Sequence, residues 1–178
     1  MRRFRRIKLH VPLALAALLL AQPTLTTTLL GTALVALGLA VRIWAAGLLH
    51  KGHELCTSGP YRYVRHPLYF GSTLGAIGFC VMAHSLWAWA VVLPVFMAIY
   101  LWQMAEEERL LAATFGEAHA AWARQVPMVT PRLLPAPADS PRAWNLQQFL
   151  VNREQYHVLV TSAFVALFYL KPLLAVLR

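Results

Sequence analysis

Residues that could do chemistry gather in two polar segments of an otherwise apolar chain, residues 53–71 and residues 106–108. In the first, His66 precedes Pro67, a residue that suits the first position of a helix. His66 and Arg65 should therefore lie at the N-terminal mouth of that helix. Free backbone N–H groups and the positive end of the helix dipole favour an anion there. This arrangement predicts a binding site for a carboxylate or a phosphate.

The second segment consists of three successive glutamates, whose carboxylates can accept hydrogen bonds from a ligand and attract a cation. Glu106 can pair with Arg109 one helical turn later, so we predict a structural role for it. Glu107 and Glu108 stay available, and Gln103 shares the helical face of Glu107. A structural alternative is open for both segments: an aromatic and arginine belt at the membrane interface for the first, and a solvated acidic collar for the second.

Other reactive residue types form no recognisable site. Cys56 and Cys80 lack any metal or redox spacing, so we predict two unpaired thiols. The histidines show no zinc spacing, and no basic stripe is interleaved with aromatic residues. We therefore expect neither a metal nor a nucleic acid as a partner. Arg153, just before the last apolar run, is a candidate for contact with a substrate, with helix capping and lipid contact as the alternatives for residues 152–154.

Apolar helices must position these segments. The apolar runs 67–83 and 86–104 should form a hairpin, so we expect the two polar segments to be neighbours at its open ends. Of the 178 residues, 59% are hydrophobic and 13% are charged, which excludes a water-soluble globule and a disordered chain. We predict an all-α, polytopic membrane bundle of about five transmembrane helices in a single domain over residues 1–178. The apolar runs that predict these helices are residues 9–21, 24–49, 67–83, 86–104 and 156–177.

Three details of the packing can be predicted. Gly71 and Gly75 have the small-xxx-small spacing of helices that pack closely. Lys171 interrupts the last apolar run, and we expect its side chain to snorkel to the membrane surface. The proline-containing stretch 128–141 is the part of the chain nearest to a linker.

The distribution of charge predicts the orientation in the membrane. With the N-terminus inside, residues 1–8, 42–66 and 105–155 share one side, which holds 14 of the 16 Lys and Arg residues and all seven acidic residues. The positive-inside rule makes this side cytoplasmic. We therefore expect an integral membrane protein of a bacterial or archaeal-type cytoplasmic membrane, with the N-terminus and the active site cytoplasmic.

The two polar segments together resemble a known family. The runs Ser58-Gly59-Pro60-Tyr61 and Arg65-His66-Pro67-Leu68-Tyr69-Phe70-Gly71, followed by Glu107-Glu108 and Phe115-Gly116, are similar to the isoprenylcysteine carboxyl methyltransferases. The related phospholipid N-methyltransferases share the paired glutamates. The resemblance covers roughly residues 45–132. It implies a small helical membrane enzyme that binds S-adenosylmethionine at the cytoplasmic face and methylates a lipophilic or lipid-linked acceptor among the membrane lipids.

Position by position, the resemblance also implies roles for residues. His66 and Glu107 become the catalytic candidates. Gln103 occupies the place of an arginine that holds the substrate carboxylate in the prenylcysteine enzymes. A neutral glutamine cannot supply that bidentate grip, which argues against a prenylcysteine carboxylate as the acceptor. The cofactor contacts would be His53, Glu54, Leu55, Cys56, Tyr61, His66, Pro67, Leu68, Tyr69, Glu107 and Glu108.

Two other functions stay open. Some membrane reductases of sterol-like lipids carry a similar Arg-His-x-x-Tyr-x-Gly segment and use a nicotinamide cofactor, although they resemble this chain less at position 68. A catalytically silent membrane scaffold that keeps the fold is the other alternative. Intact His66 and Glu107 argue against the scaffold.

Overall fold

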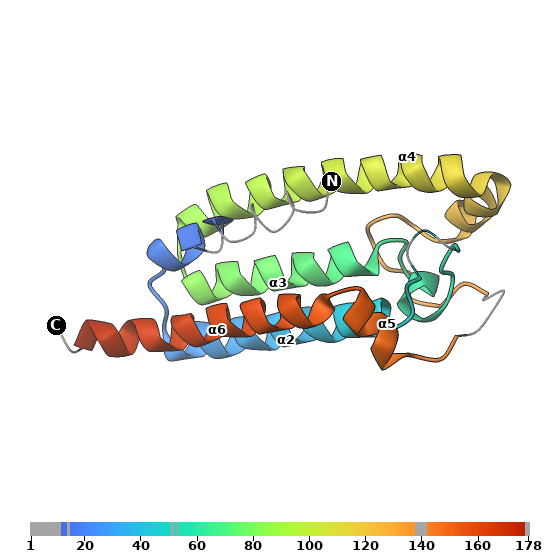
Figure 1. Ribbon diagram of the computed structural model, residues 1–178. Coiled ribbons are helices and arrows are strands. Elements are labelled where there is room, and N and C mark those ends of the chain that lie inside the picture. Colours follow the sequence, from blue (N-terminus) through green and yellow to red (C-terminus); the bar gives the residue numbers. More distant parts are fainter. Residues whose placement is uncertain (1–11, 14, 51, 53, 138–141, 177–178) are drawn as a thin grey trace. The chain divides into compact units, whose positions relative to one another are not determined.

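The computed structural model describes residues 12–13, 15–50, 52, 54–137 and 142–176, and all regular elements in these ranges are helical (Figure 1). The predicted all-α class is therefore confirmed for this part of the chain. A short helical stretch at residues 12–13 and 15–19 comes first. The elements that follow are α2 (Leu25–Ala46), η1 (Gly59–Arg62), α3 (Pro67–Ala83), η2 (Ala88–Val92), α4 (Leu93–Gln125), α5 (Leu146–Val151) and α6 (Glu154–Val176).

Two helices among the described residues are long and apolar enough to cross a membrane. They are α2, with a mean hydropathy of 1.9, and the helical stretch Ala88–Gln125, with 1.7. Only 28% of the most apolar window of each is buried. Apolar side chains thus face outward, as lipid-facing helices require and as the core helix of a soluble protein does not. These two spans are fewer than the five predicted; α3 is equally apolar but has 17 residues.

The chain forms two compact units, and the first contains residues up to Leu37, residues 73–99 and residues from 158 onward. Within it, the ring of Phe79 on α3 lies 5.8 Å from that of the fully buried Phe168 on α6. A Cβ at Gly78 would lie 2.7 Å from the carbonyl oxygen of Gly31, so only glycine allows this approach of α2 and α3. The packing role predicted for Gly75 is wrong, because a Cβ there would meet nothing within 4 Å.

Lys171 binds the end of another helical stretch, and its snorkelling to the membrane surface stays a prediction. Within the first unit, its Nζ donates to the carbonyl oxygens of Leu18, at 2.6 Å, and Ala21, at 2.7 Å, and to that of Leu19. These carbonyls end the short helical stretch 15–19, whose last C=O groups have no partner within the helix. A cation at a helix C-terminus satisfies such groups, which explains the position of the Lys171 ammonium group.

The second unit, Gly38–Ser72 and Tyr100–His157, contains every described residue that the sequence makes a candidate for catalysis or for contact with cofactor or substrate. Here a Cβ at Gly71 would lie 2.5 Å from the carbonyl oxygen of Gly38, which confirms the close packing predicted at Gly71. The core joins the end of α2, the loop before α3, the end of α4 and the stretch after it. Its buried members are Ala45, Leu48, Cys56, Tyr61, Trp122, Val126 and Ala136.

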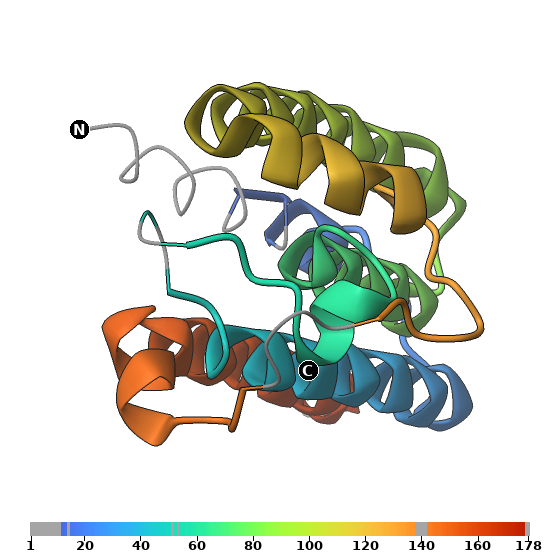
Figure 2. The same ribbon diagram turned by 90° about the vertical axis from the view of Figure 1, so that its right-hand side faces the viewer.

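Helix α4 reverses its direction at Gly116. This residue has φ 48° and ψ −121°, a backbone conformation outside the helical region. In a straight helix the eleven residues from Glu108 to His119 would span about 16 Å, yet their Oε2 and Nε2 atoms lie 3.5 Å apart. The segment after Gly116 therefore folds back, and Figure 2 shows it beside the preceding turns of α4.

Candidate active site

Glu108 is the centre of a cluster of opposite charges. Arg65 Nη1 donates to Glu108 Oε2, His66 Nε2 donates to Oε1 at 2.7 Å, and His119 Nε2 lies 3.5 Å from Oε2. All four side chains are largely buried. The loop that enters α3 and the acidic stretch of α4 are thus neighbours, as predicted. The anion at the mouth of α3 is the protein's own carboxylate, so Glu108 is not the open acceptor that the sequence suggests.

Aromatic rings hold the other side of His66. The ring of Tyr69 stands edge-on to His66, with centroids 5.6 Å apart, and Tyr100 stands edge-on to Tyr69 at 5.2 Å. Pro67 is fully buried at the start of α3, as expected from its fixed φ. His66, itself 5% exposed, is therefore fixed between a carboxylate and an aromatic edge.

Tyr61 brings a buried hydroxyl to the same unit. The residue is 6% exposed and its hydroxyl has no hydrogen-bond partner among the described residues. Burial, reinforced by the negative charge of Glu107, raises the pKa of Tyr61 well above its usual range. The phenol is therefore neutral at physiological pH and can donate a hydrogen bond. The half-buried Glu107 is near enough to the loop before α3 for its charge to contribute to the raised pKa of this phenol.

The proline-containing stretch after α4 is not a linker over its described part. Its backbone pairs with the loop before α3: Arg132 N donates to Tyr63 O at 2.9 Å, and Ala136 N donates to Arg62 O at 3.0 Å. Arg62 Nε donates in turn to Ala136 O at 2.6 Å. These bonds fix the loop that carries Tyr61, and residues 138–141 of the predicted linker lie outside the described residues.

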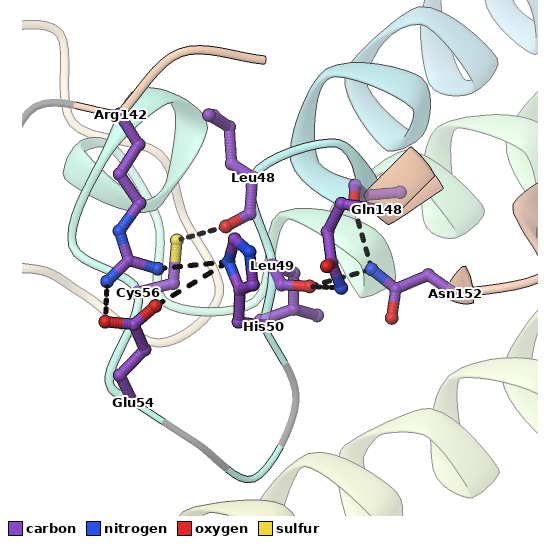
Figure 3. A network of polar contacts seen from close by, with 9 residues as sticks. Leu48, Leu49, His50, Glu54, Cys56, Arg142, Gln148 and Asn152 are labelled. Carbon is purple, nitrogen blue, oxygen red and sulfur yellow. Dashed lines mark hydrogen bonds and ion pairs between the residues drawn. The ribbon is translucent and has the colours of Figure 1, made fainter. Parts of the chain in front are cut away.

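A second polar network surrounds the loop after α2 (Figure 3). Glu54 forms an ion pair with Arg142, and its carboxylate lies 3.7 Å from His50 Nδ1. Cys56 Sγ donates to Leu48 O at 3.5 Å. Burial raises the pKa of the Cys56 thiol. Two of the cofactor contacts predicted in this loop, Glu54 and Cys56, thus already have partners within the protein.

The junction of α5 and α6 caps α2 in the same network. Asn152 Nδ2 donates to the carbonyl oxygens of Ala46 and Leu49, both at 2.8 Å, and Gln148 Nε2 donates to Leu49 O at 2.6 Å (Figure 3). Helix capping is therefore the role of Asn152, one of the alternatives considered for residues 152–154. Arg153 is exposed beside it, with φ 59°.

A buried ion pair that the sequence pattern did not reveal joins three helices of this unit. Arg42 Nη2 of α2 lies 2.5 Å from Glu154 Oε2 of α6, and Arg42 Nη1 donates to Leu68 O at 2.8 Å and to Ser72 Oγ on α3. The sequence shows Arg42 only as a charge near the end of an apolar run. Its partner lies 112 residues away, and no local spacing indicates such a pair.

The remaining predicted residues are accounted for as follows. Gln103 is buried on α4, and Glu106 lies 3.6 Å from Arg109 as predicted. Leu55 and Leu68 pack against the core that contains Tyr61. His53 lies outside the described residues. Both cysteines are free and buried, which confirms that Cys56 and Cys80 are unpaired.

His119 is a member of the charge cluster that the sequence did not predict. The sequence shows His119 as one of several scattered histidines. The sequence feature that could have indicated His119 was Phe115-Gly116. A glycine inside a helical pattern can mark a reversal of the helix, which brings the residues after it back beside the residues before it. No group of three or more His, Cys, Asp or Glu residues in the described part of the chain is arranged to hold a metal ion.

Comparison with known proteins gives relatives of two kinds. A cobalt-zinc-cadmium resistance protein of Cupriavidus metallidurans is 40% identical over 61% of this chain and 50% of its own length. A nickel-cobalt-cadmium resistance protein of Alcaligenes xylosoxydans xylosoxydans is 34% identical over the same shares. A protein-S-isoprenylcysteine O-methyltransferase of Schizosaccharomyces pombe is 29% identical over 56% of this chain and 42% of its own length.

The chain thus spans about half the length of the curated relatives it matches. No solved structure matches it. The model of the phospholipid methyltransferase family matches residues 26–118, more than half of the chain, and includes the loop before α3 and the acidic stretch of α4. The chain therefore belongs to the phospholipid methyltransferase family.

Proposed function

We propose that this protein transfers a methyl group from S-adenosylmethionine to a lipophilic or membrane-embedded acceptor. The observation that carries the proposal is the meeting of the loop before α3 with the acidic stretch of α4, seen in the contacts of Arg65 and His66 with Glu108. Membership of the phospholipid methyltransferase family and the similarity to an isoprenylcysteine O-methyltransferase support it.

Unused donors at this site fit such a cofactor. Tyr61 Oη and Arg65 Nε are buried without a hydrogen-bond partner among the described residues. A buried donor left unpaired costs about 1–3 kcal/mol. A ligand that brings a carboxylate, hydroxyl oxygens and ring nitrogens relieves this cost. When bound, S-adenosylmethionine supplies an electrophilic methyl group on a positively charged sulfur.

The residues that would hold the cofactor divide by chemistry. Arg65 offers its Nε to a carboxylate, and Tyr61 offers its hydroxyl to an acceptor atom. Glu107, the half-buried glutamate not bound within the cluster of Glu108, can accept from amino or hydroxyl groups. Apolar contact would come from Leu55, Cys56, Pro67, Leu68 and Tyr69. Glu54 and Glu108 act through the ion pairs that shape the site.

The chain's own residues would promote transfer by alignment. Displacement at a methyl carbon needs reacting groups in line and water excluded more than it needs a strong acid or base. His66, fixed between Glu108 and Tyr69, is suited to positioning. Glu107 is the second catalytic candidate, and its carboxylate would help to bind and align a positively charged methyl donor. No residue need become a covalent nucleophile.

The acceptor we propose lacks a carboxylate. Gln103, buried one turn before Glu107, is neutral. Arg42 is bound to Glu154 and Ser72, so it cannot replace the arginine of the prenylcysteine enzymes. Arg153 is exposed and is our candidate for contact with the polar end of an acceptor arriving from the bilayer.

For the orientation in the membrane, we keep the one that the distribution of Lys and Arg residues favours. We propose that α3, α6 and the short helical stretch at residues 12–13 and 15–19 cross or enter the bilayer together with the two longer helices. The N-terminus and the site would then face the cytoplasm of a bacterial or archaeal-type cell.

The names of two relatives favour a second candidate function, a contribution to divalent-metal resistance. In the described part of the chain, the charge cluster is poorly suited to a cation because the guanidinium of Arg65 contacts Glu108. We therefore propose that any role in metal resistance depends on the methylation reaction. Expression of the wild type and of Glu107→Ala in a cobalt-sensitive strain tests this: equal growth of both would exclude a methylation-dependent role.

The decisive experiment for the reaction is transfer of labelled methyl groups from S-adenosylmethionine into a total membrane lipid extract, with identification of the product. We expect a labelled lipid with the wild type and none with Glu107→Ala. Binding of only a nicotinamide nucleotide would instead support the reductase alternative. Binding of neither cofactor by the folded protein would support the scaffold.

A further inference from the structure

Trp122 has a buried indole N–H group that the folded chain leaves unused. The residue is 8% exposed, and its Nε1 has no hydrogen-bond partner among the described residues. Trp144 shows the usual outcome, because its Nε1 donates to the carbonyl oxygen of Ile43 at 2.9 Å. A buried tryptophan normally finds such an acceptor. An unpaired indole N–H inside the unit that carries the site therefore points to an acceptor on a ligand.

The surroundings of Trp122 define the kind of acceptor. The core cluster that contains Trp122 is mostly aromatic and aliphatic: its other members are Ala45, Leu48, Cys56, Tyr61, Val126 and Ala136, with Leu49, Leu55 and Leu68 packed against it. None of these side chains is charged, so this core favours a neutral, mostly apolar group over a carboxylate or phosphate. The Tyr61 hydroxyl is a second buried donor without a partner in the same core. A flat, mostly apolar heterocycle with several acceptor nitrogens matches both features.

We propose that Trp122 binds the adenine ring of the methyl donor by donating its indole N–H to a ring nitrogen. This inference rests on the proposed function and extends it to the part of α4 beyond Gly116. The reversal there brings His119 to Glu108, and the ring of His119 lies 6.0 Å from that of Trp122. The charge cluster and the adenine contact are therefore positioned by the same short helical segment.

Equilibrium binding of S-adenosylhomocysteine, which cannot react, tests the proposal without an activity assay. Trp122→Phe keeps an aromatic ring and removes only the N–H donor and the second ring of the indole. We expect it to bind about three- to tenfold more weakly, the loss typical of one hydrogen bond. The matched control is Trp102→Phe on the same helix, whose exposed indole should leave the affinity unchanged.

Analogues that lack one adenine ring nitrogen provide a second test, which needs no variant protein. The wild type should lose affinity for one of the three deaza analogues of S-adenosylhomocysteine, and Trp122→Phe should lose nothing further with that analogue. Wild-type affinity for all three analogues equal to that for the parent would overturn the proposal even if Trp122→Phe did not fold. Equal binding by the wild type and a folded Trp122→Phe would overturn it too. Absence of any binding by the wild type would instead overturn the proposed function.

Discussion

Replacing Gly116 by alanine should unfold or displace the segment that carries His119 and Trp122. At φ 48° and ψ −121°, a side chain on Cβ is strained whatever space surrounds it, and here nothing lies within 4 Å of the new carbon. Such a conformation costs a non-glycine residue about 1–3 kcal/mol. Alanine recovers about 0.4–1 kcal/mol by restricting the unfolded chain. The net effect is a destabilisation of about 1–2 kcal/mol.

Thermal unfolding of the detergent-solubilised protein, followed by circular dichroism, measures this cost. For a chain of this size, 1–2 kcal/mol corresponds to a fall in Tm of about 2–8 °C. If alanine instead straightens α4, His119 leaves Glu108, and the affinity for S-adenosylhomocysteine falls while helix content is kept. Either result follows from the strained reversal.

Gly75→Ala is the matched control. Gly75 lies within α3, and a Cβ there also meets nothing within 4 Å. Alanine in a helix is favoured over glycine by about 0.5–1 kcal/mol, so the Tm should stay or rise. A Gly116→Ala protein with wild-type Tm and wild-type ligand affinity would refute the reversal as the device that positions this segment.

Three further perturbations test the surrounding contacts. Glu108→Gln should lower the stability by about 1.5–3 kcal/mol, because buried basic groups lose a charged acceptor. Glu106→Gln should cost less than about 1 kcal/mol, since its ion pair with Arg109 is exposed. Equal Tm values for the two variants would contradict this difference. Asn152→Ala should cost about 1–3 kcal/mol by leaving the end of α2 uncapped, and an unchanged denaturation midpoint would argue against the cap. Because burial raises its pKa, the Cys56 thiol in a Cys80→Ala protein should react with iodoacetamide more slowly than a free cysteine and require a higher pH, until the protein is denatured. Rapid labelling of the folded protein at neutral pH would contradict its burial.

Local patterns in the sequence were sufficient for the helices. The long apolar runs predicted α2, α3 and α4, because a backbone in an apolar setting must satisfy its own hydrogen bonds. The i to i+3 spacing predicted the pair of Glu106 and Arg109. Pro67 correctly marked the first residue of α3. Each of these features depends on neighbours within one or two helical turns.

Features that depend on distant partners could not be predicted in this way. The Arg42–Glu154 pair and the carbonyl acceptors of Lys171 join residues more than a hundred positions apart. Nothing in their local spacing marks them. Glu108 was predicted to be an open acceptor because its partners lie on the other polar segment, and the sequence indicated that those segments meet without showing which side chains would pair.

Binding of labelled S-adenosylmethionine to the purified protein and to Tyr61→Phe tests the central claim most directly. We predict saturable binding to the wild type. Tyr61→Phe should keep the wild-type Tm, because the hydroxyl it removes has no partner in the described part of the protein, yet bind about three- to tenfold more weakly. A folded wild type that binds no S-adenosylmethionine, or a Tyr61→Phe protein that binds it as tightly as the wild type, would contradict the site as we place it.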